Sequence, residues 1–163
     1  MTTLSEENYL KAIYHLGKQG TEAVSTNAIA EKIDSKASSV TDMVKKLADK
    51  NLAHYIKYQG VSLTNEGRLA AASVIRKHRL WEVFLVEKLN FTWDEVHDVA
   101  EQLEHIKSLK LVNELDSFLG FPAHDPHGDP IPDMDGNYAL RKSVNILEMQ
   151  TGNEGVLAQV KDS

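Results

Sequence analysis

The sequence contains no cysteine. Without cysteine the chain cannot form disulfides, and it cannot hold a metal through thiolate ligands. The absence also fits the reducing cytoplasm, and we expect a cytoplasmic protein.

Long apolar runs and a basic, apolar leader are also missing. No run approaches the roughly 20 apolar residues that a membrane-spanning helix needs. Residues 1–7 are polar and acidic, unlike a signal peptide. With 42% apolar and 26% charged residues, the chain has the composition of a soluble globular protein. Its 163 residues suffice for one domain or two small ones, and we expect no membrane partner.

The chain lacks a positive net charge, since the overall balance is −6. This argues against a molecule that binds polyanions over its whole surface. The charge is uneven, however. Residues 1–76 hold ten Lys/Arg and eight Asp/Glu, a balance of +2, whereas residues 77–163 hold eight and sixteen, a balance of −8. The N-terminal half could therefore contact DNA, while the C-terminal half suits cations.

The N-terminal half has the pattern of a winged helix-turn-helix. Apolar spacing predicts helices over residues 5–18, 25–33 and 37–50, with Ser5 as the cap of the first. Alternation over residues 52–57, a turn at 58–60 and a return over 61–63 predict a hairpin. In such a module the third helix enters the major groove of DNA.

Candidate DNA contacts lie on the second and third helices and on the wing. Hydroxyl groups suit base edges and phosphates, and lysines suit phosphates. The candidates are Ser25, Thr26, Lys36, Ser38, Ser39, Thr41, Asp42, Lys45, Lys46, Lys57 and Tyr58. The alternative is a generic helical hairpin with a solvated polar face, and Lys45 and Lys46 alone do not decide between the two.

A helix predicted over residues 91–107, capped by Thr92 with Glu95, carries four side chains that bind metals. They are His97, Glu101, Glu104 and His105. At about 100° per residue they fall within roughly 100° of arc on one helix face. This stripe predicts metal binding, and the alternative is a solvated acidic face.

A preceding long helix, capped by Thr64 and running to about Leu89, carries His78 and Glu82 one turn apart. Alone, such a pair is more often a surface hydrogen bond than a metal site. The link at residues 90–91 is short, so the two helices should be antiparallel neighbours. We therefore expect His78 and Glu82 to converge with His97.

A further helix is predicted over residues 108–119. Together with the end of the long helix it offers more apolar surface than one helical layer needs, which favours a dimer interface. The expected dimerisation residues are Trp81, Phe84, Leu85, Leu111, Leu115 and Phe118.

All four prolines fall in residues 121–137, which we interpret as an extended linker. Its histidines and aspartates resemble a metal site, but a segment broken by proline does not fix ligand geometry. Strand-like stretches follow at 143–148 and 156–160. The last 24 residues cannot bury a β core alone, so we expect that the chain stops inside a domain.

These segments together resemble the metalloregulators of the diphtheria-toxin-repressor type, which respond to iron or manganese. The motifs are SEENYLKAIYHL, SSVTDMVKKLADKNL, LTNEGR, RKHRLWEVFL, EVHDVAEQLEH and DPHGDPIP, over about residues 4–132. The resemblance implies a mainly α fold with four parts. They are a winged helix-turn-helix over 1–64, a helical metal-binding and dimerisation domain over 65–120, a Pro-rich linker over 121–138 and an incomplete SH3-like β segment over 139–163.

The resemblance also implies two metal sites per subunit. One would use His78, Glu82 and His97, completed in longer members by the SH3-like domain. The other would use Glu101, Glu104 and His105 with Asn8 of the first helix. Lys11 stands where manganese-type members place a ligating glutamate, so their compact binuclear site cannot form here unchanged.

Nitrogen and oxygen donors favour Mn²⁺, with Fe²⁺ a close alternative, and Zn²⁺, Co²⁺ or Ni²⁺ could replace them in vitro. The expected function is a metal-activated repressor of metal-ion uptake, binding a palindromic operator as a homodimer and needing no small-molecule substrate. One alternative is a winged-helix regulator with structural metals. Another is a dimetal enzyme, although the two Glu-x-x-His repeats typical of that class are missing.

Overall fold

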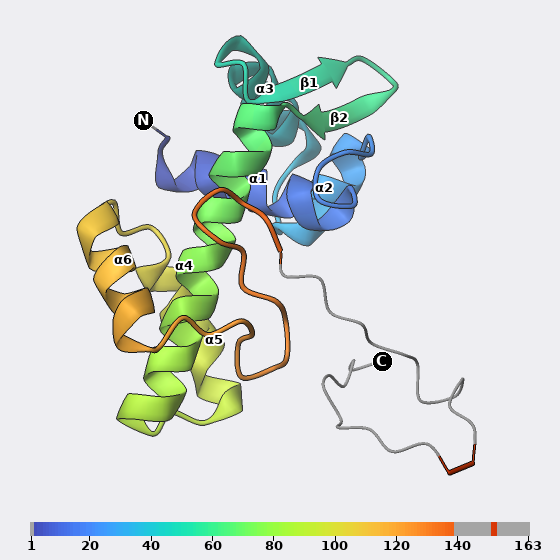
Figure 1. The fold of residues 1–163 in the computed structure, drawn as a ribbon. Coiled ribbons are helices and arrows are strands. Elements are labelled where there is room, and N and C mark those ends of the chain that lie inside the picture. Colours follow the sequence, from blue (N-terminus) through green and yellow to red (C-terminus); the bar gives the residue numbers. More distant parts are fainter. Residues whose placement is uncertain (1, 139–150, 153–163) are drawn as a thin grey trace.

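The computed structural model describes residues 2–138 and 151–152. The predicted mainly α fold is confirmed (Figure 1). The elements are α1 (Leu4–Leu16), α2 (Thr26–Lys32), α3 (Ala37–Asp49), β1 (Ala53–Ile56), β2 (Gly60–Leu63), α4 (Asn65–Leu89), α5 (Trp93–Leu103) and α6 (Leu109–Phe118). The strands expected at 143–148 and 156–160, and with them the SH3-like segment, lie outside the described residues. No helix in the described ranges is both long and apolar enough to cross a membrane.

Helices α1 to α3 and the β1–β2 hairpin form the predicted winged helix-turn-helix. The two strands are antiparallel, with Ala53 opposite Leu63 and Ile56 opposite Gly60. The apolar stripe of α3, made of Val40, Val44 and Leu47, is fully buried and packs on α1 and α2. The opposite side of α3 is exposed, because its hydroxyl and lysine side chains are polar and remain in contact with water.

The first helix begins one residue earlier than predicted, and the cap assigned to Ser5 is wrong. Thr3 is the cap. Its hydroxyl accepts a hydrogen bond from the Glu6 amide, and the Glu6 carboxylate accepts one from the Thr3 amide. This reciprocal pair satisfies two amides that a cap at Ser5 would leave without partners.

Helix α4 runs through both parts of the molecule (Figure 1). The predicted cap, Thr64, is confirmed. Its hydroxyl accepts from the Gly67 amide at 3.0 Å and donates to the Asn51 carbonyl at 2.8 Å. A Cβ at Gly67 would lie 1.8 Å from the Leu52 carbonyl oxygen, so only glycine allows this close approach to the start of the wing.

Thr64→Ala should lower the free energy of unfolding by about 1–2 kcal/mol. The change removes the cap of α4 and leaves the buried Gly67 amide without its acceptor. Urea unfolding monitored by circular dichroism measures the effect. Thr64→Ser keeps the hydroxyl and should recover most of the loss; an equal loss in both variants would show that the methyl group, not the cap, matters.

The C-terminal half consists of α4, α5 and α6, with a small core of Leu80, Val83, Val112, Leu115 and Ile131. Helix α5 packs along α4. It is shorter than predicted, because it ends at Leu103 with Glu104 as its C-terminal cap. The helical spacing of residues 104–106 suggested a longer helix, but the chain turns there and directs Glu104 toward α4.

Residues 121–138 form a strap that lies beside α4 (Figure 1). Ile131 is buried in the C-terminal core, and Arg79 of α4 contacts Asp125 and the Pro130 carbonyl oxygen. At its end, the Tyr138 hydroxyl accepts a 3.1 Å hydrogen bond from the Tyr14 hydroxyl of α1. The segment contains no helix and no strand of the sheet, as its prolines predict. It nevertheless packs against α4 and α1 through the contacts just described.

Candidate metal centre

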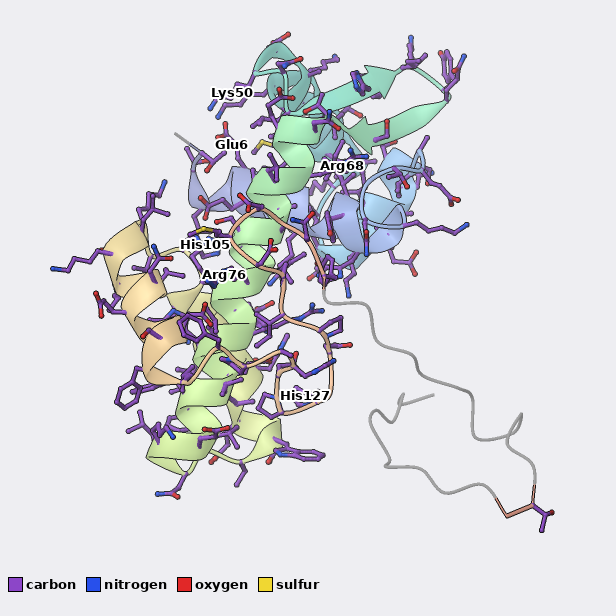
Figure 2. All side chains as sticks on the ribbon, in the orientation of Figure 1. Glu6, Lys50, Arg68, Arg76, His105 and His127 are labelled. Carbon is purple, nitrogen blue, oxygen red and sulfur yellow. The ribbon has the colours of Figure 1, made fainter. Side chains whose placement is uncertain are left out.

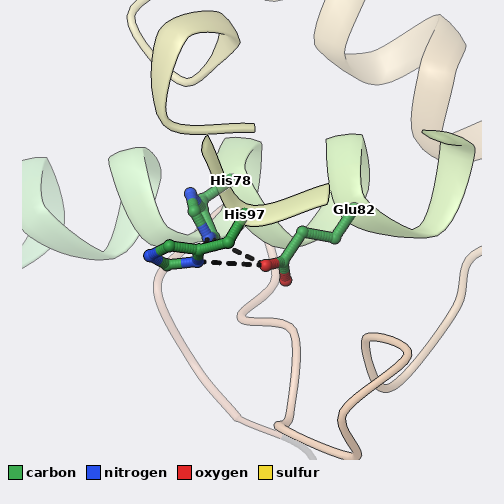
Figure 3. Close-up of side chains that lie close together, drawn as sticks. All are labelled: His78, Glu82 and His97. Carbon is green, nitrogen blue, oxygen red and sulfur yellow. Dashed lines mark hydrogen bonds and ion pairs between the residues drawn. The ribbon is translucent and has the colours of Figure 1, made fainter. Parts of the chain in front are cut away.

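Three side chains converge between α4 and α5 (Figure 3). His78 Nε2 lies 3.0 Å from Glu82 Oε1 and 3.2 Å from His97 Nδ1, and His97 Nδ1 lies 3.5 Å from the same Glu82 oxygen. His78 and Glu82 are buried, whereas the His97 side chain is 56% exposed. The group is thus buried on the α4 side and open to solvent on the α5 side.

Local sequence explains this convergence. His78 and Glu82 are four residues apart on α4, so they share one face. Asn90 then adopts a left-handed conformation, with φ of 57°, and ends α4. The chain reverses, and burial of Val96 and Ala100 against α4 fixes the face of α5 that carries His97. One donor atom from each of His78, Glu82 and His97 lies within 4.8 Å of the other two. Among the described residues, these three side chains form a group that could hold a metal ion.

The centre is strongly charged when it holds no metal. Burial alone would lower the pKa of His78, but hydrogen bonds to Glu104 and Glu82 outweigh it and raise that pKa to about 9. Burial would raise the pKa of Glu82, yet the hydrogen bond and charge of His78 lower it. At neutral pH His78 is therefore an imidazolium that lies between the carboxylates of Glu82 and Glu104. A bound cation would take the place of the positive charge on His78.

Sequence reasoning set His127 aside as part of a linker. In the structure His127 Nε2 lies 3.8 Å from Glu82 Oε1, and its ring packs 5.8 Å from that of Trp93. The strap thus brings a third imidazole to the edge of the centre. The dense histidines and aspartates of residues 124–135 were the available signal, but nothing in the sequence showed that the segment packs on α4.

The four residues of the predicted stripe do not share one site. His97 joins the centre on α4, while Glu104 and His105 lie just past the end of α5. Glu104 Oε2 lies 2.6 Å from His78 Nδ1, and both Glu104 oxygens accept from the Lys11 ammonium. Glu101 also contacts Lys11, at 3.3 Å.

The residues of the implied second metal site make other contacts than the sequence indicated. His105 Nδ1 lies 2.7 Å from Glu7 Oε2, a residue that sequence reasoning missed. Asn8 lines a surface hollow with Glu101, Glu104 and His105. Glu7 and Lys11 of α1, rather than Asn8, therefore pair with the side chains at the end of α5.

Comparison with known proteins identifies the family. Residues 1–61 match the family model described as "Iron dependent repressor, N-terminal DNA binding domain". Residues 64–133 match "Iron dependent repressor, metal binding and dimerisation domain". A solved manganese-dependent transcriptional repressor, in complex with manganese, superposes with a TM-score of 0.81 at 41% identity, over 96% of this chain and 72% of that one. The chain belongs to the iron-dependent repressor family, of the diphtheria-toxin-repressor type.

Other relatives agree with this assignment to the iron-dependent repressor family. The iron-dependent repressor IdeR of Mycobacterium leprae (strain TN) is 32% identical over 154 residues, which cover 90% of this chain and 66% of the relative. The structure of the manganese regulator SloR matches with a TM-score of 0.71 at 44% identity, over 84% of this chain and 63% of that one. The chain spans about half to two thirds of the length of the curated relatives it matches.

The predicted DNA-contact residues of this chain lie on the exposed side of α2, α3 and the wing. Three of them also have internal partners. Ser25 accepts from the Ala28 amide and caps α2, the Thr41 hydroxyl donates to the Ala37 carbonyl, and Lys46 lies 3.0 Å from Glu6. At the wing tip Tyr58 is 92% exposed, with the Lys57 ammonium 4.9 Å from its ring centroid.

The predicted dimer residues divide into three groups, which are buried, half-buried and exposed. Leu85 and Leu115 are buried inside the subunit. Trp81 and Phe84 are half-buried against that core. On α6 and just after it, Leu111 and Phe118 of the predicted set are exposed, and so are Leu109 and Phe121, which were not predicted.

Proposed function

We propose that this chain is a metal-dependent DNA-binding repressor of metal-ion uptake. The observation that carries the proposal is the convergence of His78 and Glu82 of α4 with His97 of α5. Helix α4 continues directly from the wing, so a cation bound to these residues would contact the helix that leads to the DNA-binding unit. The relatives described above are named as metal-dependent repressors or regulators, which supports a regulator over a dimetal enzyme.

The donor set fits a divalent metal ion. Its atoms are separated by 3.0, 3.2 and 3.5 Å. Ligands that lie about 2.1 Å from one ion have spacings of this size. His78, Glu82 and His97 would hold the ion, with His127 positioned to approach. Because every donor is nitrogen or oxygen, we propose Mn²⁺ first and Fe²⁺ as the close alternative.

The proposed parts are the DNA-binding domain over 1–64, the metal-binding and dimerisation domain over 65–120, the joining strap over 121–138 and the beginning of an SH3-like domain over 139–163. The two family models, which meet between residues 61 and 64, support the first boundary. A homodimer formed through the exposed apolar surface of α6 would present two recognition helices to a palindromic operator. The metal would favour the orientation of these helices that matches the half-site spacing.

Titration of Mn²⁺ and of Fe²⁺ at fixed ionic strength tests this function, with DNA affinity read by fluorescence anisotropy. The probe is a palindromic fragment from upstream of the protein's own gene. We expect each effective metal to raise affinity about tenfold or more, which is about 1.4 kcal/mol of coupling. His97→Ala should remove the response, because His97 is an exposed donor whose loss spares the core. Asp98→Ala, its exposed neighbour, is the control.

Flat DNA affinity at metal concentrations that fill the centre would contradict the proposal. It would leave a winged-helix regulator whose metal only stabilises the fold.

A further inference from the structure

We propose that the Lys11 ammonium is the resident cation of the second metal site implied by the family, so that the helical part of each subunit takes one metal ion. This inference rests on the proposed function only for the role of that one ion. The residues expected to form the second site, Glu101, Glu104 and His105 with Asn8, do not fit a metal in this chain. Their charged side chains already pair with Lys11 and Glu7 of the protein itself.

Lys11 uses its full hydrogen-bonding capacity at this position. Its Nζ lies 2.8 and 2.9 Å from the two oxygens of Glu104 and 3.3 Å from Glu101 Oε1. An ammonium has three N–H donors, and here three carboxylate oxygens accept them. Lys11 therefore satisfies the same carboxylates that a hard cation would need.

The ion pair is shielded from water. The Lys11 side chain is 17% exposed and that of Glu104 is 1% exposed. A metal that displaced Lys11 would leave the ammonium without partners in a largely buried position, and such an exchange is strongly unfavourable. Lys11 is attached to the chain, so it also competes at a high local concentration.

The remaining donors are engaged as well. His105 Nδ1 lies 2.7 Å from Glu7 Oε2, and the second oxygen of Glu7 accepts from the Thr2 hydroxyl. Glu104 Oε2 is shared with His78. Asn8 adds no negative charge, and the buried ammonium of Lys77 nearby, which contacts the Ile106 carbonyl at 3.4 Å, adds a further positive charge. A second divalent ion would therefore meet two lysines and the first ion.

The consequence for regulation is specific. Lys11 and Glu7 connect α1 of the DNA-binding unit to the end of α5 without a metal ion between them. The connection that a second ion would make is therefore already provided by side chains in this chain. Metal response then depends on a single ion at His78, Glu82 and His97.

Counting bound Mn²⁺ tests the inference. Isothermal titration calorimetry, with metal analysis of the dialysed protein, should give one Mn²⁺ per wild-type chain, lost in His97→Ala. Lys11→Glu removes the ammonium and adds a carboxylate, and it should bind two. The second ion should persist when His97→Ala is combined with Lys11→Glu. Lys18→Glu, which makes the same charge change at an exposed lysine, is the control and should still bind one.

Two results would overturn the inference. One is two Mn²⁺ per wild-type chain with the second lost in Glu101→Ala. The other is a single Mn²⁺ in a folded Lys11→Glu protein and in Lys11→Met, which frees the carboxylates without adding one. The proposed function fails separately, when wild type binds one Mn²⁺ without any change in DNA affinity.

A measurement on the unmodified chain makes the test independent of how the variants fold. An ammonium that donates to three carboxylate oxygens should give a resolved Lys Nζ–H signal in ¹H–¹⁵N NMR spectra. This signal, assigned to Lys11, should remain at saturating Zn²⁺, a diamagnetic probe. Its loss on adding Zn²⁺ would mean that metal displaces Lys11, and the inference would be wrong.

Discussion

His78→Ala should abolish the metal response of operator binding and weaken Mn²⁺ binding by at least about 100-fold, since it removes a ligand at the middle of the centre. His78 is the residue with the most connections there, because it contacts Glu82, His97 and Glu104. The variant loses a donor to the metal and also leaves two buried carboxylates without their shared partner. The expected DNA affinity is that of the metal-free wild type at every Mn²⁺ concentration.

Calorimetry for Mn²⁺ and fluorescence anisotropy for DNA measure the two effects of His78→Ala separately. Circular dichroism must first show a folded chain. Glu87→Ala, on an exposed part of the same helix, is the matched control and should behave as wild type. Mn²⁺ affinity within threefold of wild type in His78→Ala would show that the ion binds elsewhere.

Glu6→Ala should lower the free energy of unfolding by about 2–3 kcal/mol at pH 7. Glu6 is fully buried and lies near Lys50 (Figure 2), with Lys50 Nζ at 2.8 and 2.9 Å and Lys46 Nζ at 3.0 Å. Burial alone would raise the pKa of Glu6, but its hydrogen bonds to Lys50, Lys46 and the Thr3 amide lower that pKa from 4.5 to about 2. Because Lys46 and Lys50 are partly exposed, solvent screening makes the loss smaller than the full shift implies.

The same carboxylate makes stability depend on pH in a defined window. The folded-state pKa is lower than the unfolded value, so the contribution is complete above about pH 4.5 and is lost as the pH falls toward 2. Urea unfolding at pH 7 and pH 3 should therefore show a smaller difference between wild type and Glu6→Gln at the lower pH. Glu31→Gln, an exposed carboxylate on α2, is the control. An unchanged difference at pH 3 would place the stabilising effect of Glu6 in packing rather than charge.

Local patterns predicted most of the fold. The periods of apolar residues located six helices and the wing among the described residues, because each element buries one face. The convergence of His78 and Glu82 with His97 also followed from local rules, namely the i,i+4 spacing and the short link at Asn90. These features depend on residues close in sequence or on neighbouring helices.

The remaining features depend on contacts between distant segments. Ser5 and Thr3 are equally good caps by residue type, and Glu6 decides between them through its side-chain hydrogen bond. The pairing of Glu7 with His105 joins residues 98 positions apart, and no periodicity indicates it. The approach of His127 to Glu82 required the strap to pack on α4, which its proline content argued against.

Helix α4 is continuous from the wing to the candidate metal centre, so a small rotation at His78 produces a larger displacement at the wing end. His78 lies 13 residues from the wing end of this helix, which is about 20 Å at 1.5 Å per residue. A tilt of about 10° around His78 would displace the wing end by about 3.5 Å, close to the roughly 3.4 Å rise of one base pair. No loop interrupts α4 to absorb the rotation. Under the proposed function, a change in angle of this size at the metal centre would move the DNA-binding unit by about one base-pair step.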